Sequence, residues 1–248
     1  MLEATAIRKH YKAPGRVVRA LDGVSFELGP GQRRGLVGHS GSGKSTLGQV
    51  MSLLLKPDAG ELSIDGEPVR KWGVSAPRRL RQQVQLIWQS PRLASDPRLR
   101  LREMILEPLA ASGRLPRDRG ARKALLEEWA DRVGITPELL ERFPHEVSDG
   151  QLQRACLARA LVLEPAYLVC DEVSSMLDVS TQAAILDVLA SVQAERPVGI
   201  VLITHDHVLA RHWCEDITEI ADGQITAYGV PAAVDEEVPV SPATVPGS

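Results

Sequence analysis

A glycine-rich loop between a predicted strand and a predicted helix has the spacing of a phosphate-binding site. Residues 38–46 read GHSGSGKST and satisfy the pattern G-x-x-x-x-G-K-[ST]. Backbone N–H groups in such a loop, together with the start of the next helix, attract phosphate groups. Lys44 would reach the β- and γ-phosphates, and Ser45 would offer its hydroxyl to Mg²⁺. We expect phosphate contacts from Gly38, His39, Ser40, Gly41, Ser42, Gly43, Lys44, Ser45 and Thr46.

Two adjacent acids, Asp171 and Glu172, follow an apolar run at residues 167–170 that predicts a buried parallel strand. Ligands of open α/β sheets bind at the carboxyl ends of the strands, where both acids would lie. Asp171 would hold Mg²⁺, directly or through a water molecule. Glu172 would orient or deprotonate a water aimed at the γ-phosphate. The alternative for this pair, two solvated acids at a strand end, is disfavoured because a phosphate loop is present in the same sequence. For the loop itself, a merely flexible Gly-Ser segment is disfavoured because it lies between a predicted strand and a predicted helix.

A second helix start lies immediately upstream, in the stretch VSDGQLQRACLARAL. Ser148 has the type of a helix N-cap, and apolar residues recur at helical spacing after it. Free N–H groups at this helix start could receive a phosphate, yet the loop at Gly38 already supplies one cradle. Two cradles and one nucleotide favour a site that is shared between subunits.

The elements that must position these residues form an alternating α/β pattern. Strand-like alternation with hairpins covers the first 30 residues and returns after residue 60, with a turn at Asp65-Gly66. Residues 95–163 are rich in Ala, Leu, Glu and Arg, which predicts an inserted helical subdomain. The order strand 167–170, helix 181–195, strand 199–204 predicts a parallel βαβ unit. We expect one domain over residues 1–229 and a flexible Pro-rich tail over 230–248.

Composition excludes several classes of protein. The chain has 248 residues, 44% of them hydrophobic, and a formal net charge of −3, so it is globular and shows no general basic surface for nucleic acid. Its three cysteines, Cys156, Cys170 and Cys214, are widely spaced, which argues against a disulfide framework or a metal cluster. No apolar run reaches the roughly 20 residues that cross a bilayer, and no leader is expected at the start.

With these motifs in order, the sequence resembles the ATP-binding-cassette (ABC) ATPases up to about Gly229. The family signature L-S-G-G-Q corresponds here to Val147, Ser148, Asp149, Gly150 and Gln151, which match it at three of the five positions. The resemblance implies that Ser148, Gly150 and Gln151 contact the nucleotide of a second subunit. It also implies a P-loop NTPase (RecA-like) parallel core with an antiparallel β subdomain and a helical subdomain.

Further positions match the family one by one. Tyr11 would stack on adenine, and Gln89, in LIWQSP, would sense Mg²⁺ and the transport partner. By the same resemblance, Asp178 would end a loop that carries contacts between subunits, and His205 would touch the γ-phosphate. Alone, Tyr11, Gln89 and His205 have ordinary alternatives: a half-buried aromatic, a surface amide, and a loop histidine paired with Asp206. The resemblance thus assigns catalysis to Glu172, His205, Lys44 and Gln89, and the metal to Ser45, Gln89 and Asp171.

The resemblance also implies the cofactors and partners. These are ATP and Mg²⁺, a second ABC ATPase subunit in a homo- or heterodimer, transmembrane permease subunits and, indirectly, an extracytoplasmic solute-binding protein. The subunit would be peripheral, on the cytoplasmic face of the plasma (inner) membrane. The stretches around Gln89 and before Val147 look like the branch that imports oligopeptides, dipeptides and nickel or metallophore complexes. No cysteine follows Cys214, which favours the shorter nickel or dipeptide type.

One alternative to transport stays open, and a second is opposed by the sequence. A non-transport ABC ATPase of a soluble metabolic complex, of the phosphonate-degradation type, would have much the same sequence. A simple kinase is opposed by the signature at Ser148 and by His205, which a kinase would not need. Two departures from the signature also matter. Val147 stands where the family has leucine and keeps the apolar packing role. Asp149 stands where the family usually has glycine, so its carboxylate would either repel a triphosphate or point away from it.

Overall fold

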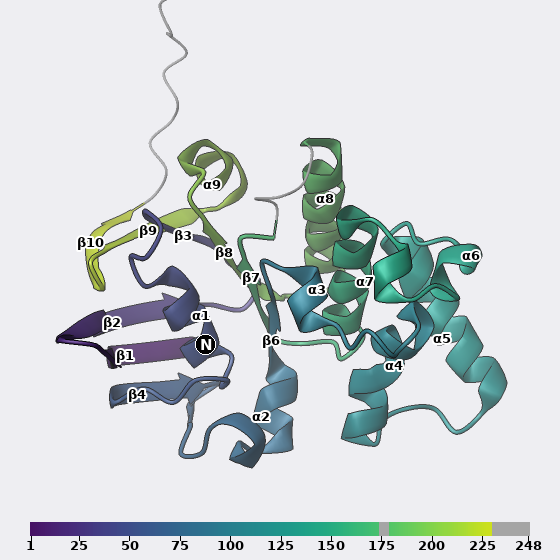
Figure 1. Ribbon diagram of the computed structural model, residues 1–248, viewed down its shortest axis with the longest axis horizontal. Coiled ribbons are helices and arrows are strands. Elements are labelled where there is room, and N and C mark those ends of the chain that lie inside the picture. Colours follow the sequence, from purple (N-terminus) through teal and green to yellow (C-terminus); the bar gives the residue numbers. More distant parts are fainter. Residues whose placement is uncertain (174–178, 230–248) are drawn as a thin grey trace, which may run out of the picture.

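A mostly parallel sheet runs through the centre of the part of the chain that the computed structural model describes, residues 1–173 and 179–229 (Figure 1). Its strand order is β10-β9-β3-β8-β7-β6; β10 is antiparallel to β9, and the others are parallel. The strands are β3 (Arg33–Val37), β6 (Val84–Ile87), β7 (Tyr167–Asp171), β8 (Gly199–Thr204), β9 (Asp216–Ala221) and β10 (Gln224–Gly229). The carboxyl ends of β3, β6, β7 and β8 therefore share one edge.

Successive residues of the central strands pack on opposite faces, because side chains alternate along a strand. In β7, Tyr167 and Val169 join one hydrophobic cluster, whereas Leu168 and Cys170 join the other. All five residues of β7 are buried, as expected of a parallel strand that is covered on both faces. Both clusters thus meet at the strand that delivers Asp171. The predicted βαβ unit is confirmed, with α8 (Val179–Glu195) between β7 and β8.

An antiparallel sheet covers one face, with the order β2-β1-β4-β5. Its strands are β1 (Leu2–Ala13), β2 (Arg16–Leu28), β4 (Ala59–Ile64) and β5 (Glu67–Pro68). Asp65 and Gly66 both have positive φ, 50° and 77°, as two-residue hairpin turns require, so the predicted turn is confirmed. β2 continues through Gly23, which has φ 82°, at a shift in the register with β1.

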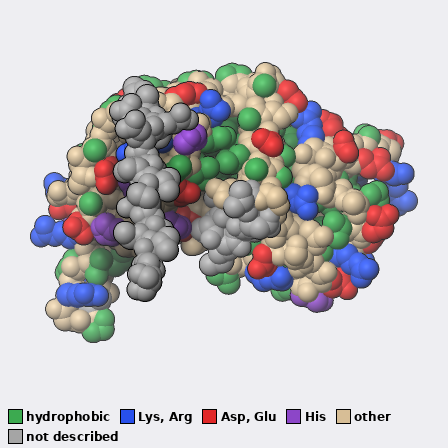
Figure 2. All heavy atoms as spheres, turned by 90° about the horizontal axis from the view of Figure 1, so that it is seen from above, with side chains coloured by type: hydrophobic (Ala, Val, Ile, Leu, Met, Phe, Trp, Pro, Cys, Tyr) green, Lys and Arg blue, Asp and Glu red, His purple; other side chains and the backbone are tan. Residues whose placement is uncertain are grey.

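Helix α1 (Lys44–Met51) lies next to the antiparallel sheet (Figure 1) and shares its hydrophobic cluster with β7 and β8. The other short helices of the core are η1 (Gly73–Ser75), α2 (Arg78–Gln83) and α9 (His207–Trp213). Acidic and basic side chains are interspersed on the face seen in Figure 2, in keeping with a net charge near zero. None of the helices in the described ranges is both long and apolar enough to span a membrane.

Helices cover the opposite face of the sheet and extend away from it (Figure 1). They are α3 (Pro91–Ala94), α4 (Leu101–Ser112), α5 (Arg119–Arg132), α6 (Pro137–Leu140), the 3-10 turn η2 (Pro144–Glu146) and α7 (Asp149–Leu161). Pro137 and Pro144 stand at first helical positions, where a missing N–H costs nothing. Pro108 is different, since it lies inside α4.

The predicted amphipathic pattern of α7 is confirmed. Leu152, Cys156, Leu157 and Leu161 are all buried in the cluster that α7 shares with α4, α8 and the sheet. Cys170 and Cys214 are buried as well, and the three cysteines are free thiols. Residues 230–248, where the sequence predicts a tail, lie outside the described residues.

Candidate functional site

The phosphate loop is shaped by glycines that no other residue could replace. Gly38 and Gly43 have φ of 155° and 109°, and an added Cβ would lie only 2.1 Å from the Ile220 carbonyl oxygen and 2.3 Å from that of Ala20. The loop therefore packs against β9 and β2 through backbone alone. Gly43 caps α1 without a side-chain hydrogen bond, which leaves the first N–H groups of that helix directed at the loop.

The Lys44 side chain is buried and folds back over the loop. Its Nζ donates to the carbonyl oxygens of Gly38 at 2.7 Å and His39 at 2.9 Å. Burial lowers the pKa of Lys44, and the nearby charges of Glu172 and Asp171 oppose that shift. The ammonium thus stands between the backbone of the loop and two carboxylates, where it would stabilise the negative charge of bound phosphate oxygens.

A cavity of about 200 Å³ opens beside Lys44. Its lining residues are Ala20, Ser40, Gly41, Gly43, Lys44, Ser45, Thr46, Gln89 and Glu172. Other predicted loop residues act from outside the lining: Gly38 and His39 hold Lys44, and the Ser42 side chain is buried. Tyr11 is not in the lining either; it pairs with Val18 in the β1–β2 hairpin, and the residue is 41% exposed.

Asp171 ends β7 and accepts a hydrogen bond from the Ser45 hydroxyl at 3.0 Å. Burial raises the pKa of Asp171; the Glu172 charge adds to the rise, whereas the Ser45 hydrogen bond and the Lys44 charge oppose it. A hydroxyl and a carboxylate oxygen held together at a phosphate loop are the hard donors that Mg²⁺ prefers. These residues therefore fit a magnesium ion.

Glu172 takes a left-handed backbone conformation, with φ 46°, that is uncommon outside glycine. Gln89 Nε2 donates to its Oε2 at 2.9 Å, and His205 Nδ1 lies 3.6 Å from its Oε1. These three residues follow β7, β6 and β8, so adjacent parallel strands deliver them to one point. Asp206 does not pair with His205 through its side chain as the alternative proposed; it caps α9 by accepting from the Leu209 N–H.

The signature residues lie at the start of α7 and do not line the cavity. Ser148 is the N-cap, as predicted: its hydroxyl accepts from the Gln151 N–H at 3.2 Å, and the Gln151 side chain accepts from the Ser148 N–H at 3.0 Å. Within one chain, Ser148, Gly150 and Gln151 are thus separate from the phosphate loop. Asp178 lies outside the described residues.

Sequence reasoning missed two contributors. Ala20 places its carbonyl against Gly43 and lines the cavity, although no motif marks it. Arg92, three residues after Gln89 in the chain, forms an ion pair with Asp149 at 2.7 Å. Its charge was visible in the sequence, but its partner was not, because the two residues are far apart in the chain.

The family profile described as ABC transporter matches residues 21–175, well over half of the chain. The chain belongs to the ABC transporter ATPase family. This ATPase is an ATP-binding and ATP-hydrolysing subunit that energises an ABC transporter, and its fold is the predicted P-loop NTPase α/β fold. The resemblance noted from the sequence is confirmed.

Relatives share most of the length of this ATPase. It is 36% identical over 250 residues to the di/tripeptide transport ATP-binding protein DppF of Pseudomonas aeruginosa (strain UCBPP-PA14), covering 98% of this chain and 76% of that protein. It is 35% identical over 235 residues to the dipeptide transport ATP-binding protein DppF of Escherichia coli (strain K12), covering 92% and 70%. Against the glutathione import ATP-binding protein GsiA of the same E. coli strain, identity is 39% over 222 residues, covering 89% and 35%.

Solved structures are similar as well. The ATP-binding cassette MJ0796, in a dimeric post-hydrolysis state bound to ADP and Pi, has a TM-score of 0.84 at 26% identity, covering 94% of this chain and 100% of that one. A second dimeric structure of MJ0796 has a TM-score of 0.85 at 25% identity, with the same coverage.

Proposed function

We propose that this ATPase hydrolyses ATP with Glu172 as the base. The observation that carries the proposal is the convergence of Gln89 and His205 on the Glu172 carboxylate, beside the phosphate-loop cavity. Glu172 would accept a proton from the water whose oxygen attacks the γ-phosphorus. Gln89 and His205 would hold that carboxylate and water in line, and Lys44 would stabilise charge on the phosphate oxygens.

Ser45 and Asp171 would hold Mg²⁺, with Gln89 nearby, and the ion would supply positive charge at the β- and γ-phosphates. The loop residues from Gly38 to Thr46 would donate to the phosphates. Tyr11 would stack on the adenine, since its exposed ring belongs to the same hairpin as Ala20.

The complete site would be shared between two subunits. Ser148, Gly150 and Gln151 lie away from the phosphate loop of their own chain, whereas the solved relative MJ0796 is a dimer in its ADP-bound state. The start of α7 in one subunit would close on the γ-phosphate bound by the other, with the loop that ends at Asp178 contributing to the same interface. The second subunit would be another copy or a related ATPase.

The dimer has a direct test. Glu172→Gln should bind ATP and Mg²⁺ without turnover, so its mass in solution, measured by sedimentation, should shift from monomer to dimer when ATP is added. If ATP binds and the chain stays monomeric, a homodimer is excluded and a second, different ATPase subunit must be sought in the same membrane complex.

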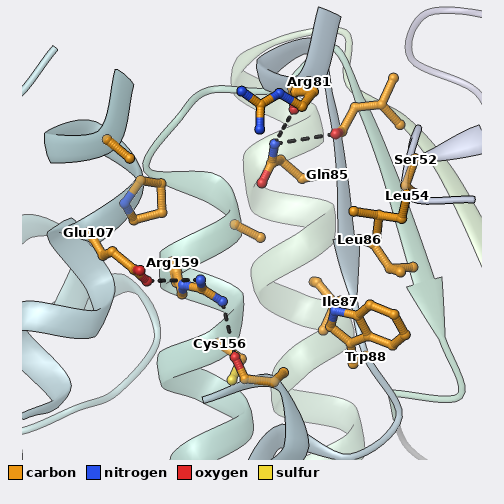
Figure 3. A pocket seen from close by; sticks show the side chains of 15 residues that line it. Ser52, Leu54, Arg81, Gln85, Leu86, Ile87, Trp88, Glu107, Cys156 and Arg159 are labelled. Carbon is orange, nitrogen blue, oxygen red and sulfur yellow. Dashed lines mark hydrogen bonds and ion pairs between the residues drawn. The ribbon is translucent and has the colours of Figure 1, made fainter. Parts of the chain in front are cut away.

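A groove between the sheet and the helices is the proposed docking site for a permease. The groove holds about 320 Å³ and runs between β6 on one side and α4 and α7 on the other. Leu54 and Trp88 expose apolar surface into it, while Arg159 is fixed by Glu107 at 2.9 Å (Figure 3). An amphipathic cytoplasmic helix of the permease fits such a mixed surface. Trp88 also precedes Gln89, so docking and the catalytic carboxylate would be linked.

Peptides are the proposed cargo, imported with the help of an extracytoplasmic solute-binding protein. The names of the relatives carry this proposal, since they describe di- and tripeptide transport and glutathione import. Nickel stays a prediction from the sequence. The site of action would be the cytoplasmic face of the plasma (inner) membrane.

Location separates transport from a soluble metabolic complex. A transporter subunit should sediment with membranes when its permease is present and leave them when the permease gene is deleted. If the protein stays wholly in the soluble fraction while the permease is present, the transport proposal is wrong, whereas ATP hydrolysis is unaffected by that result.

A further inference from the structure

Arg92 contacts the beginning of the signature segment with all three nitrogens of its guanidinium, through one ion pair and two hydrogen bonds. Its Nε lies 2.7 Å from the Asp149 carboxylate, and its two terminal nitrogens donate to the carbonyl oxygens of Pro144 and Val147, each at 3.1 Å. The planar guanidinium can satisfy three acceptors in different directions, which a lysine ammonium on a flexible stem does not match. One side chain therefore fixes both the charge and the backbone just before Ser148.

The segment that carries Arg92 is fastened along one face of α7. Gln153 donates to the Trp88 carbonyl at 3.3 Å, Asp149 pairs with Arg92, and Arg159 donates to the Ala94 carbonyl at 3.3 Å. Of the α7 residues in these contacts, 149 and 153 are four residues apart and neighbours on one helix face, and 159 lies nearly two turns further along. Residues 88–94, which follow β6 and include Gln89, are thus held against the signature helix by three contacts.

The charge of Asp149 needs compensation in a closed dimer. Asp149 is the first residue of α7, between Ser148 and Gly150, and its side chain is 54% exposed. In water such a surface ion pair stabilises the fold little. When a second subunit closes and expels water, an unpaired carboxylate beside a phosphate becomes strongly unfavourable.

We propose that Arg92 is a positioning residue that neutralises Asp149 and thereby makes this signature compatible with the γ-phosphate of the opposite subunit. The inference rests on the proposed shared site. Asp149 can stand at this position of the signature because Arg92, from α3, pairs with its carboxylate. The nucleotide of the opposite subunit would then not meet an uncompensated negative charge.

Two variants, one without the Arg92 charge and one without both the Arg92 and the Asp149 charges, test this role of Arg92. They are measured in the full chain, assembled with its partner ATPase where that partner is required. Arg92→Ala should lower kcat for ATP about tenfold or more, because it leaves one partner of a desolvated charge pair alone. ATP affinity of the separated subunit should stay at the parental value, since its own phosphate loop is untouched. Arg92→Ala/Asp149→Asn should recover most of the lost rate. Arg98→Ala, which breaks an ion pair with Asp96 just after this segment, is the matched control and should not lower kcat.

An unchanged kcat in Arg92→Ala would overturn the proposal. A double variant as slow as Arg92→Ala would overturn it too, because Arg92 would then act only on the shape of the loop and not on the charge of Asp149. Hydrogen exchange of the nucleotide-free chain gives a readout that needs no shared site. Arg92→Ala should accelerate amide exchange at residues 148–152, and Arg98→Ala should not; parental exchange in both would also contradict the positioning role. If the parental complex itself neither dimerises nor hydrolyses ATP, the proposed function fails, and the exchange result still decides what Arg92 does.

Discussion

The Gln89 amide donates to the Glu172 carboxylate at 2.9 Å across 83 residues of sequence, which joins the ends of β6 and β7. On the opposite side, the His205 ring lies 3.6 Å from the other oxygen of that carboxylate. Glu172 is therefore held from two neighbouring strands, in a backbone conformation that turns it out of the sheet. A carboxylate fixed in this way has the orientation that a general base requires.

Replacement of Glu172 should separate binding from turnover. We expect Glu172→Gln to keep ATP affinity and to lower kcat by about 10²–10⁴-fold, because a positioned proton acceptor contributes that much. Lys44→Ala should instead weaken ATP binding, since it removes the buried cation at the phosphates. Single-turnover hydrolysis and equilibrium ATP binding measure the two effects. Normal hydrolysis in Glu172→Gln would show that another group is the base; Glu128→Gln, on the surface of α5, is the control.

The buried Asp171 carboxylate should lower the free energy of unfolding when no nucleotide is bound. Burial raises its pKa, so the folded chain binds this proton more tightly than the unfolded chain does. The free energy of unfolding therefore falls as pH rises from the ordinary aspartate pKa through the raised one, and it stays lower above that range. Asp171→Asn removes this pH-dependent loss of stability. We expect a higher Tm at neutral pH, by about 2–4 °C for each kcal/mol relieved, together with a loss of ATP hydrolysis.

The pH dependence identifies the source of that change. Thermal unfolding of Asp171→Asn should show a smaller decrease in Tm with rising pH above the ordinary aspartate range than the parent shows. Asp96→Asn is a control of opposite sign, because hydrogen bonds from Arg98 lower the pKa of Asp96 to about 2. Equal Tm shifts in both variants would contradict an effect of burial at Asp171.

Tyr11 should affect recognition of the base and not of the phosphates. Tyr11→Ala is expected to weaken ATP binding by about 1–3 kcal/mol, the contribution of one stacked base, whereas Tyr11→Phe keeps the ring and should bind normally. Calorimetric titration with ATP measures this difference. Inorganic triphosphate supplies the matched probe, since it lacks the base; if its affinity falls in Tyr11→Ala as much as that of ATP, the stacking role is wrong.

The groove should govern membrane attachment. Leu54 is 49% exposed and lines it, so Leu54→Glu would place a charge against an apolar partner surface. We expect the membrane-bound fraction to fall, with a loss of binding free energy of about 2 kcal/mol or more if Leu54 is a central contact. Val208→Glu changes a comparably exposed apolar residue on α9, away from the groove, and should leave attachment intact. Equal detachment by both variants would indicate a general surface effect.

Features formed by neighbouring residues were predictable from the sequence. The phosphate loop, the Ser148 cap with Gln151, the turn at Asp65-Gly66 and the strand that delivers Asp171 each depend on conformational preferences or hydrogen bonds within a few residues. Their physics is local, so residue type and spacing are enough to predict them. Asp149 was visible as a departure from the family pattern, but its consequence was not.

Only the tertiary structure decided which distant side chains meet. The register of β6, β7 and β8 brings Gln89 and His205 onto Glu172, and the packing of α3 on α7 brings Arg92 onto Asp149. A shift of one residue in any of these strands would turn the side chains to the other face, and nothing in a local stretch of sequence specifies that register. The sequence by itself determined the chemical groups and their local geometry; the packed sheet and helices determined which groups act together, because those contacts depend on the whole core.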